Sequence, residues 1–134
     1  LARLDERNAR RRSLVGAYRA GVAAHAELLI PFEGEDATSA CHIVPVVAPD
    51  EATRDRIRAR THDDGIQTSV HYHPVHRFRI YDPQPDLPIT EDYSRREVTV
   101  PLFPTMSEAD VARVLTSVDA AILEGRPYDS PGVR

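Results

Sequence analysis

Three histidines fall within six positions of the segment GIQTSVHYHPVHRF, at His71, His73 and His76, and Arg77 follows the last of them. Imidazole groups bind metal ions, exchange protons near neutral pH and donate or accept hydrogen bonds from polar ligands. These residue types therefore suggest three interpretations: a metal site, a ligand-binding pocket or a polar surface loop.

The metal interpretation depends on whether the three imidazoles converge. Alternate residues of an extended segment point the same way, so His71 and His73 have the spacing of two ligands. Pro74 interrupts the extended segment before His76, and no cysteine or carboxylate stands close by in the sequence. We therefore expect no intrinsic metal site, and a histidine-dependent metal-binding domain is the less favoured alternative.

Nucleophilic catalysis has weak support in the sequence. Cys41 and His42 are adjacent, so on a strand their side chains would point to opposite faces. A buried core cysteine is the simpler interpretation. The chain shows no Gly-rich phosphate loop, G-x-S-x-G elbow or H-E-x-x-H motif. All 17 basic residues are arginine, so no lysine is present to form a Schiff base with a carbonyl cofactor.

A binding loop is the interpretation favoured for the histidines. The segment 73–88 contains four prolines, which argue against regular secondary structure. Aromatic, imidazole and guanidinium groups are concentrated in and just before it, and loops of this length commonly line functional sites. A ligand-binding role is thus preferred over a plain surface loop.

The hydrophobic pattern predicts the elements that position this loop. Their order is helix, strand, helix, strand, loop, short helix, short strand, helix. They span residues 1–23, 39–48, 50–62, 66–72, 73–88, 90–97, 98–104 and 107–124. This order is typical of an α/β (α+β) two-layer sandwich with a small, partly antiparallel sheet and flanking helices. We expect one domain over residues 1–134, with a frayed tail at 126–134.

Local signals refine these elements. Pro45 inside the first strand predicts an edge position or a bulge. Thr90 is predicted to cap the short helix, and Ser107 with Asp110 approximates a capping box for the last one. Gly65 is free to take a positive φ after the second helix. The apolar stripe of the first helix comprises Leu1, Leu4, Leu14, Val15, Tyr18 and Val22.

Composition excludes several functional classes. The chain has 134 residues, of which 41% are hydrophobic and 28% charged, as in a globular protein. Its net charge of −4 predicts no general attraction to nucleic acid or an anionic membrane. No apolar run could span a bilayer, and no signal peptide is evident. A single cysteine fits a reducing compartment, so a cytoplasmic location is expected. Because the first residue is leucine, we expect the chain to begin inside a longer product.

Four stretches carry a family resemblance. They are LARLDERNARRRSLVGAYRAGV, SACHIVPVV, DDGIQTSVHYHPVHRFRIY and ITEDYSRREVTVPLFPTMSEADVARVL. In this order they resemble the C-terminal part of the DegT/DnrJ/EryC1/StrS family, which are aminotransferases that use pyridoxal 5′-phosphate (PLP) and act on sugars. The most specific motifs are those around VHY and VPLFPTM.

The resemblance implies that this chain is the small C-terminal domain of a fold type I aminotransferase. In that family a large N-terminal domain carries the Schiff-base lysine and most cofactor contacts. PLP would therefore not be bound covalently by this chain, which alone is expected to be inactive. The implied substrates are a nucleotide-linked keto-sugar and an amino donor such as glutamate, and the implied assembly is a homodimer.

The resemblance also places the VHY segment at the substrate side of the active-site cleft. On this basis the expected substrate-binding residues are His71, Tyr72, His76 and Arg77, whereas no catalytic residue is expected in this chain. His73 stands where relatives often have proline, so its role stays open. The main alternative is a stand-alone module that binds sugar nucleotides without catalysis.

Overall fold

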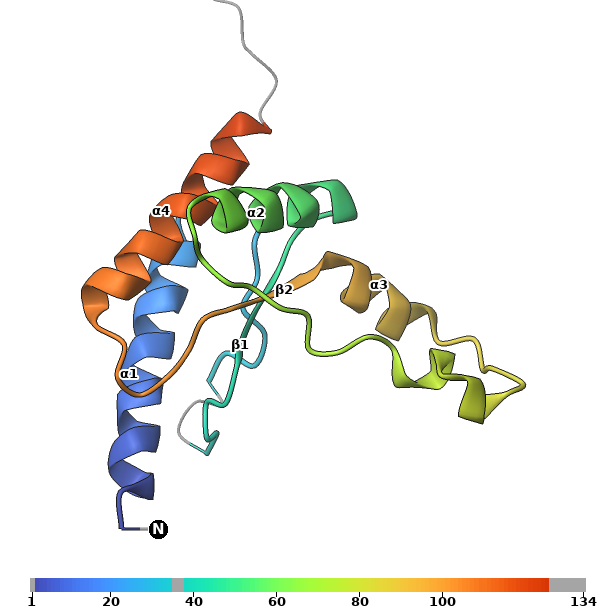
Figure 1. Ribbon diagram of the computed structural model, residues 1–134, viewed down its shortest axis with the longest axis horizontal. Helices are drawn as coiled ribbons and strands as arrows, with labels where there is room; N and C mark the ends of the chain where they lie inside the picture. Colours follow the sequence, from blue (N-terminus) through green and yellow to red (C-terminus); the bar gives the residue numbers. More distant parts are fainter. Residues whose placement is uncertain (1, 35–37, 126–134) are drawn as a thin grey trace, which may run out of the picture.

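The structure is a computed structural model that describes residues 2–34 and 38–125. Leu1 of the predicted apolar stripe and the predicted frayed tail at 126–134 lie outside the described residues. Figure 1 shows helices around two short central strands, with one segment projecting to the side.

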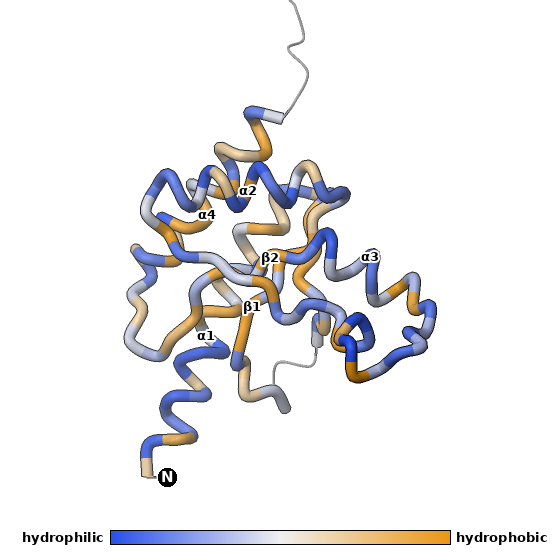
Figure 2. Tube along the Cα trace, turned by 45° about the vertical axis from the view of Figure 1, so that its right-hand side comes forward, coloured by the Kyte–Doolittle hydropathy of each residue, from blue (hydrophilic) through white to orange (hydrophobic). Residues whose placement is uncertain are grey.

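The sheet at the centre is antiparallel. Strand β1 (Val44–Val47) pairs with β2 (Glu97–Val100), and Val44 lies opposite Val100. Isolated bridges widen the sheet on both sides, from Leu29 to β1 and from Ser69 to β2. All residues of both strands are buried, and Figure 2 shows hydrophobic residues along this central part of the chain.

Pro45 occupies the outer side of β1, as the sequence predicts. Val47 exchanges two backbone hydrogen bonds with Leu29, at 2.8 and 3.0 Å. Backbone groups alternate sides along a strand, so Pro45, two residues earlier, faces the same outer side. Its missing N–H therefore interrupts no hydrogen bond to β2.

Four helices surround the strands in the described part of the chain (Figure 1). Helix α4 (Glu108–Glu124) packs against both α1 (Leu4–Val22) and α2 (Glu51–Asp63), and the shorter α3 (Pro88–Arg96) packs against α2. The apolar side chains of α1, α2 and α4 join those of the strands in a single core, to which α3 contributes no buried residue. The helical members of that core include Leu14, Val15, Tyr18, Val22, Ile57, Val111, Val114, Val118, Ala121 and Ile122. The predicted two-layer α/β fold is confirmed.

Helix boundaries follow from their capping residues. Ser107 accepts a hydrogen bond from the Asp110 backbone N–H, and Asp110 accepts one from the Ser107 N–H, which is the predicted capping box. Asp50 caps α2 by accepting the Thr53 N–H at 2.7 Å. Gly65 has φ +70° just after α2. The sequence allowed for a positive φ there, because glycine adopts it without strain.

Three sequence predictions about local structure are wrong. The strand predicted at 66–72 is reduced to the single bridge at Ser69, because only that residue meets the edge of β2. Thr90 does not cap α3, which begins at Pro88 after Leu87 and has no side-chain cap. The strand predicted from residue 39 begins only at Val44, since Cys41 has φ +45°, which is incompatible with an extended strand.

Only the second half of α1 buries its apolar stripe. Leu14 and Tyr18 are each 1% exposed, whereas Leu4 is 48% exposed. Arginines on the same helix bind backbone carbonyls of the adjoining loops. Arg10 donates to the Met106 carbonyl and Arg19 to the Ile30 carbonyl, each at 2.7 Å. These bonds anchor the loops because a guanidinium offers several donors to carbonyls that helices and strands leave unpaired.

Residues 72–89 form an arm that extends away from the core (Figure 1). The arm contains two single-turn 3-10 helices, η1 (Val75–Arg77) and η2 (Arg79–Tyr81). Four prolines explain why no longer element forms there. Large apolar side chains are exposed along the arm: Tyr72, Val75, Phe78, Ile80, Tyr81, Leu87 and Ile89.

Candidate functional site

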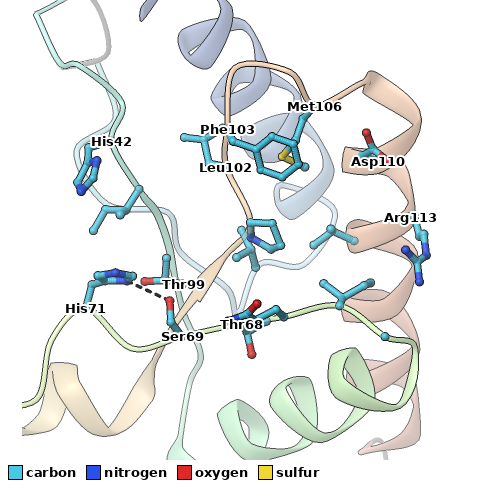
Figure 3. A pocket seen from close by; sticks show the side chains of 17 residues that line it. His42, Thr68, Ser69, His71, Thr99, Leu102, Phe103, Met106, Asp110 and Arg113 are labelled. Carbon is cyan, nitrogen blue, oxygen red and sulfur yellow. Dashed lines mark hydrogen bonds between the residues drawn. The ribbon is translucent and has the colours of Figure 1, made fainter. Parts of the chain in front are cut away.

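A cleft of about 450 Å³ opens beside the sheet, between the segment that follows α2, the loop that follows β2, and α4. Its apolar side comes from β2 and the following loop, through Val100, Leu102, Phe103 and Met106. Figure 3 shows the polar groups at its two ends, with His42 and His71 at one end and Asp110 and Arg113 at the other. This combination of an apolar surface with a few polar groups is typical of small-molecule sites.

His71 is held in this cleft by hydrogen bonds on both sides. Its Nδ1 lies 3.2 Å from the Ser69 hydroxyl, the contact dashed in Figure 3. Its backbone N–H donates to Glu97 Oε2 at 3.1 Å. The Tyr72 ring meets the imidazole edge-on, with 4.7 Å between the ring centroids. The imidazole is thus presented at the cleft in a fixed orientation.

Glu97 lies beneath His71 at the start of β2 and is fully buried. The Thr99 hydroxyl donates to its Oε1, while the His71 N–H occupies its Oε2. Burial raises the pKa of the Glu97 carboxyl above its usual value, and these two hydrogen bonds partly oppose that shift. The sequence analysis missed Glu97 because it placed this residue at the end of the helix predicted at 90–97, whereas Glu97 is the first residue of β2.

His76 and Arg77 lie elsewhere, on the arm. His76 is 8% exposed, and its Nε2 is 3.0 Å from Glu91 Oε1 on α3. Arg77 donates to the same carboxylate oxygen. The hydrogen bonds from His76 and then Arg77 lower the pKa of Glu91, although its partial desolvation acts against them. Together these contacts fix η1 against α3.

A second hollow, of about 300 Å³, lies between α2, η1 and α3. We call it the α2–α3 hollow; it is lined by Glu51, Arg54, His73, Pro74, Arg77, Glu91, Ser94 and Arg95. The structure therefore does not bring the predicted site residues together. His71 lines the cleft, His73 and Arg77 line the hollow, His76 is buried beside it, and Tyr72 is 66% exposed on the arm.

Two further candidates from the sequence occupy different environments. Cys41 is buried, as the sequence suggested, although in a loop preceding β1. His42 lines the cleft, a position that sequence reasoning missed because it treated this residue only as a partner of Cys41. Within residues 2–34 and 38–125 no group of three or more His, Cys, Asp or Glu side chains is placed to hold a metal ion. In the same part of the chain, no helix combines the length and apolar character that crossing a bilayer requires.

This chain is similar in sequence to curated proteins and similar in fold to solved structures. A curated relative, the spore coat polysaccharide biosynthesis protein SpsC of Bacillus subtilis (strain 168), is 34% identical over 128 residues. That alignment covers 88% of this chain and 33% of SpsC. The aminotransferase TlmJ from Streptoalloteichus hindustanus has the same fold, with a TM-score of 0.85 and 28% identity over 92% of this chain and 34% of TlmJ.

The structure of S. venezuelae DesV in complex with a ketimine intermediate is a further match. It has a TM-score of 0.80 and 28% identity, covering 95% of this chain and 34% of DesV. The chain thus spans about a third of the length of the relatives it matches. The family model described as the DegT/DnrJ/EryC1/StrS aminotransferase family matches residues 1–119. The chain therefore belongs to the DegT/DnrJ/EryC1/StrS aminotransferase family.

Proposed function

We propose that this chain is the small domain of a longer PLP-dependent aminotransferase that acts on a nucleotide-linked keto-sugar in the cytoplasm. The observation that supports this most directly is the family match across residues 1–119, together with a cleft on the VHY side of the domain. The other substrate would be an amino donor such as glutamate. The partners would be a large N-terminal domain and a second subunit in a homodimer.

The residues of this chain do not fit the covalent attachment of PLP. The sequence contains no lysine, so no side-chain amine is available to hold the aldehyde carbon of the cofactor. Under this proposal the cofactor belongs to the large domain, and the chain alone does not transaminate. The small domain would supply binding surface and orientation for the substrate.

His71 is the residue of this chain most directly placed for substrate contact. It lines the cleft and is fixed by Ser69 and by the buried Glu97, so its orientation costs little additional entropy on binding. We propose that Tyr72 borders the same substrate region, and that His76 and Arg77 act from the arm. In this role His76 positions Glu91 and Arg77, since it is itself buried.

The first test measures the activity of the longer polypeptide that carries this chain. With glutamate and nucleotide-linked keto-sugars, it should form 2-oxoglutarate and an amino sugar, while this chain alone should form neither. Borohydride reduction of the isolated chain with PLP should trap no stoichiometric adduct on its side chains. A stoichiometric adduct would contradict the proposal that the cofactor is held elsewhere.

A second test addresses His71 in the isolated chain. Calorimetric titration with nucleotide-linked sugars should give an affinity that falls about tenfold in His71→Ala, the cost of one hydrogen bond to a polar ligand. His62→Ala is the matched control, because the His62 side chain is 89% exposed near the end of α2 and outside the cleft. Equal losses in both variants would argue against a role for His71.

The alternative function is a stand-alone module that binds sugar nucleotides. The cleft favours it, since the pocket exists within this chain without any other domain. An immunoblot of source cells separates the two proposals. A product much longer than 134 residues supports the aminotransferase, and a product of this size supports the binding module.

A further inference from the structure

The chain leaves the central sheet after Ser69 and returns to it at Glu97, the first residue of β2. The arm and α3 lie between these two points. Of residues 72–96, all of which the structure describes, only His76 is buried. The core therefore holds this long excursion of the chain mainly at its two ends.

One carboxylate joins the two ends of the excursion. Glu97 Oε2 accepts the backbone N–H of His71 at 3.1 Å. We call this contact the arm neck. In the described chain beyond His71, no backbone N–H has a hydrogen-bond partner again until Arg77, which donates to the Pro74 carbonyl. The arm neck is thus the last bond that fixes the main chain before the arm begins.

The imidazole of His71 is held through the same carboxylate. The Ser69 hydroxyl lies 3.2 Å from His71 Nδ1, and the Ser69 backbone exchanges two hydrogen bonds with Thr99, at 2.8 and 3.1 Å. Thr99 in turn donates its hydroxyl to Glu97. These contacts close a ring that starts and ends at Glu97, so the main chain and the side chain of His71 are both restrained by it.

The charged and titratable groups around Glu97 do not explain its burial. Arg54 of α2, whose charge acts on the carboxylate, is paired with Asp55 at 2.8 Å and with Glu51 at 3.3 Å. On α3, burial and then the charge of Glu97 raise the pKa of Tyr93. A carboxylate buried without a close ion pair costs stability. The hydrogen bonds that Glu97 accepts therefore indicate what it does: it holds the neck.

We propose that Glu97 is a positioning residue whose carboxylate closes the arm neck and so holds His71 ready to contact a ligand in the cleft. An imidazole that is ordered before binding spares the complex the entropy cost of ordering it. Because the same contact anchors the arm, a displacement of the arm is transmitted to the cleft. The identity of the ligand rests on the proposed function, whereas the closing of the neck does not.

The first experiment measures amide hydrogen exchange by NMR. Glu97→Met removes both acceptors but keeps a flexible side chain of similar length. It should speed exchange of the His71 amide about tenfold, the loss of one net hydrogen bond, and leave Ser69 and Thr99 within about twofold. Glu97→Gln keeps an acceptor for the His71 N–H and should restore its protection. Glu6→Met, exposed on α1, is the matched control and should change none of the three amides.

An equal rise in exchange at His71, Ser69 and Thr99 would show general loosening and would overturn a positioning role. The unmodified chain provides a further test that does not depend on the folding of Glu97→Met. If its His71 amide exchanged as fast as that of an unstructured peptide, the neck would be open and the proposal wrong.

The second experiment is a double-mutant cycle, with calorimetric titration of uridine diphosphate glucose as the probe. His71→Ala and Glu97→Met should each raise the Kd about tenfold, and the combined variant should raise it no further, because Glu97 acts through His71. Binding with additive losses, about a hundredfold in the combined variant, would overturn this inference alone. Selective exchange at His71 without binding of any nucleotide-linked sugar would support the neck and count against the proposed function.

Discussion

Glu97 carries its ionisable carboxyl group in the interior of the protein, away from solvent. Its carboxylate is fully buried and accepts hydrogen bonds from the Thr99 hydroxyl and the His71 N–H. Because burial raises its pKa in the folded state, that state binds a proton more tightly than the unfolded chain does. The contribution of Glu97 to stability therefore declines as the pH rises from its ordinary pKa of 4.5 through the raised value.

The variant Glu97→Gln should consequently be more stable than the unmodified chain at pH 7.5, by about 1 kcal/mol, since a glutamine buries no charge. Its carbonyl oxygen can still accept the His71 N–H. Urea unfolding at pH 4.5 should show a much smaller difference between the two proteins. Glu33→Gln, in an exposed loop, is the control and should change stability little at either pH. A pH-independent difference for Glu97→Gln would contradict the assignment of a buried carboxylate.

At the scale of elements, the contact between α1 and α4 depends on Gly21. A Cβ atom added there would lie 2.4 Å from Leu115 Cδ1 and 3.0 Å from its Cγ. Leu115 is partly buried and packs against the core, so its side chain would have to leave that packing to admit a methyl group. Glycine thus favours the close approach of the two helices at this position.

Two glycines of α1 make a matched pair of variants. Gly21→Ala should lower the free energy of unfolding by about 1–2 kcal/mol, because overpacking outweighs the better helix propensity of alanine. Gly16→Ala should raise it by up to about 1 kcal/mol, since nothing lies within 4 Å of the added Cβ. Chemical denaturation measures both. Equal stabilisation by the two substitutions would show that α1 and α4 are not closely packed at Gly21.

The start of α4 depends on its capping box. Ser107→Ala should lower the free energy of unfolding by about 1 kcal/mol, because the Asp110 N–H loses its acceptor. Ser13→Ala, on the exposed side of α1, should change it by less than about 0.5 kcal/mol. The hydrogen bond from the Ser107 backbone N–H lowers the pKa of Asp110. The stabilisation that the Asp110 carboxylate contributes is therefore complete above the ordinary pKa of an aspartate, and it is lost as the pH falls through the lowered pKa. If Ser107→Ala left the free energy of unfolding unchanged, the prediction that α4 depends on this cap would be wrong.

At the scale of the whole molecule, the arm leaves an apolar surface uncovered. Ile80 is 84% and Ile89 85% exposed, and five other large apolar residues of the arm are also exposed. Monomeric proteins seldom expose connected apolar patches beyond a few hundred Å². In the proposed aminotransferase this surface would lie against the large domain or a second subunit.

The isolated chain is therefore expected to self-associate weakly through the arm. Sedimentation velocity should show a concentration-dependent increase in mean mass, and the double variant Ile80→Glu, Ile89→Glu should suppress it. Leu123→Glu is the control, because Leu123 is 59% exposed on α4, outside the arm. A strictly monomeric profile at high concentration would contradict this prediction.

The helices could be predicted within a few residues, because periodicity and capping are properties of short windows. The segment at 66–72 shows the limit of that approach. Its alternating pattern predicts a strand, yet a strand forms only where a neighbour supplies hydrogen bonds, and β2 reaches only Ser69. The same limit applies to Arg54, which looks like one of several solvated arginines of α2 but is 9% exposed in the structure.

The sequence by itself determined the helical elements, the lack of any lysine for a Schiff base and the motifs of the aminotransferase family. The tertiary structure decided how the histidine cluster is divided, with His71 in the cleft and His73 at the α2–α3 hollow. It also decided that Glu97, 26 residues from His71 in the chain, supports it. The physical reason is that backbone propensities act over a few residues, whereas a binding site is made by side chains that only packing brings together.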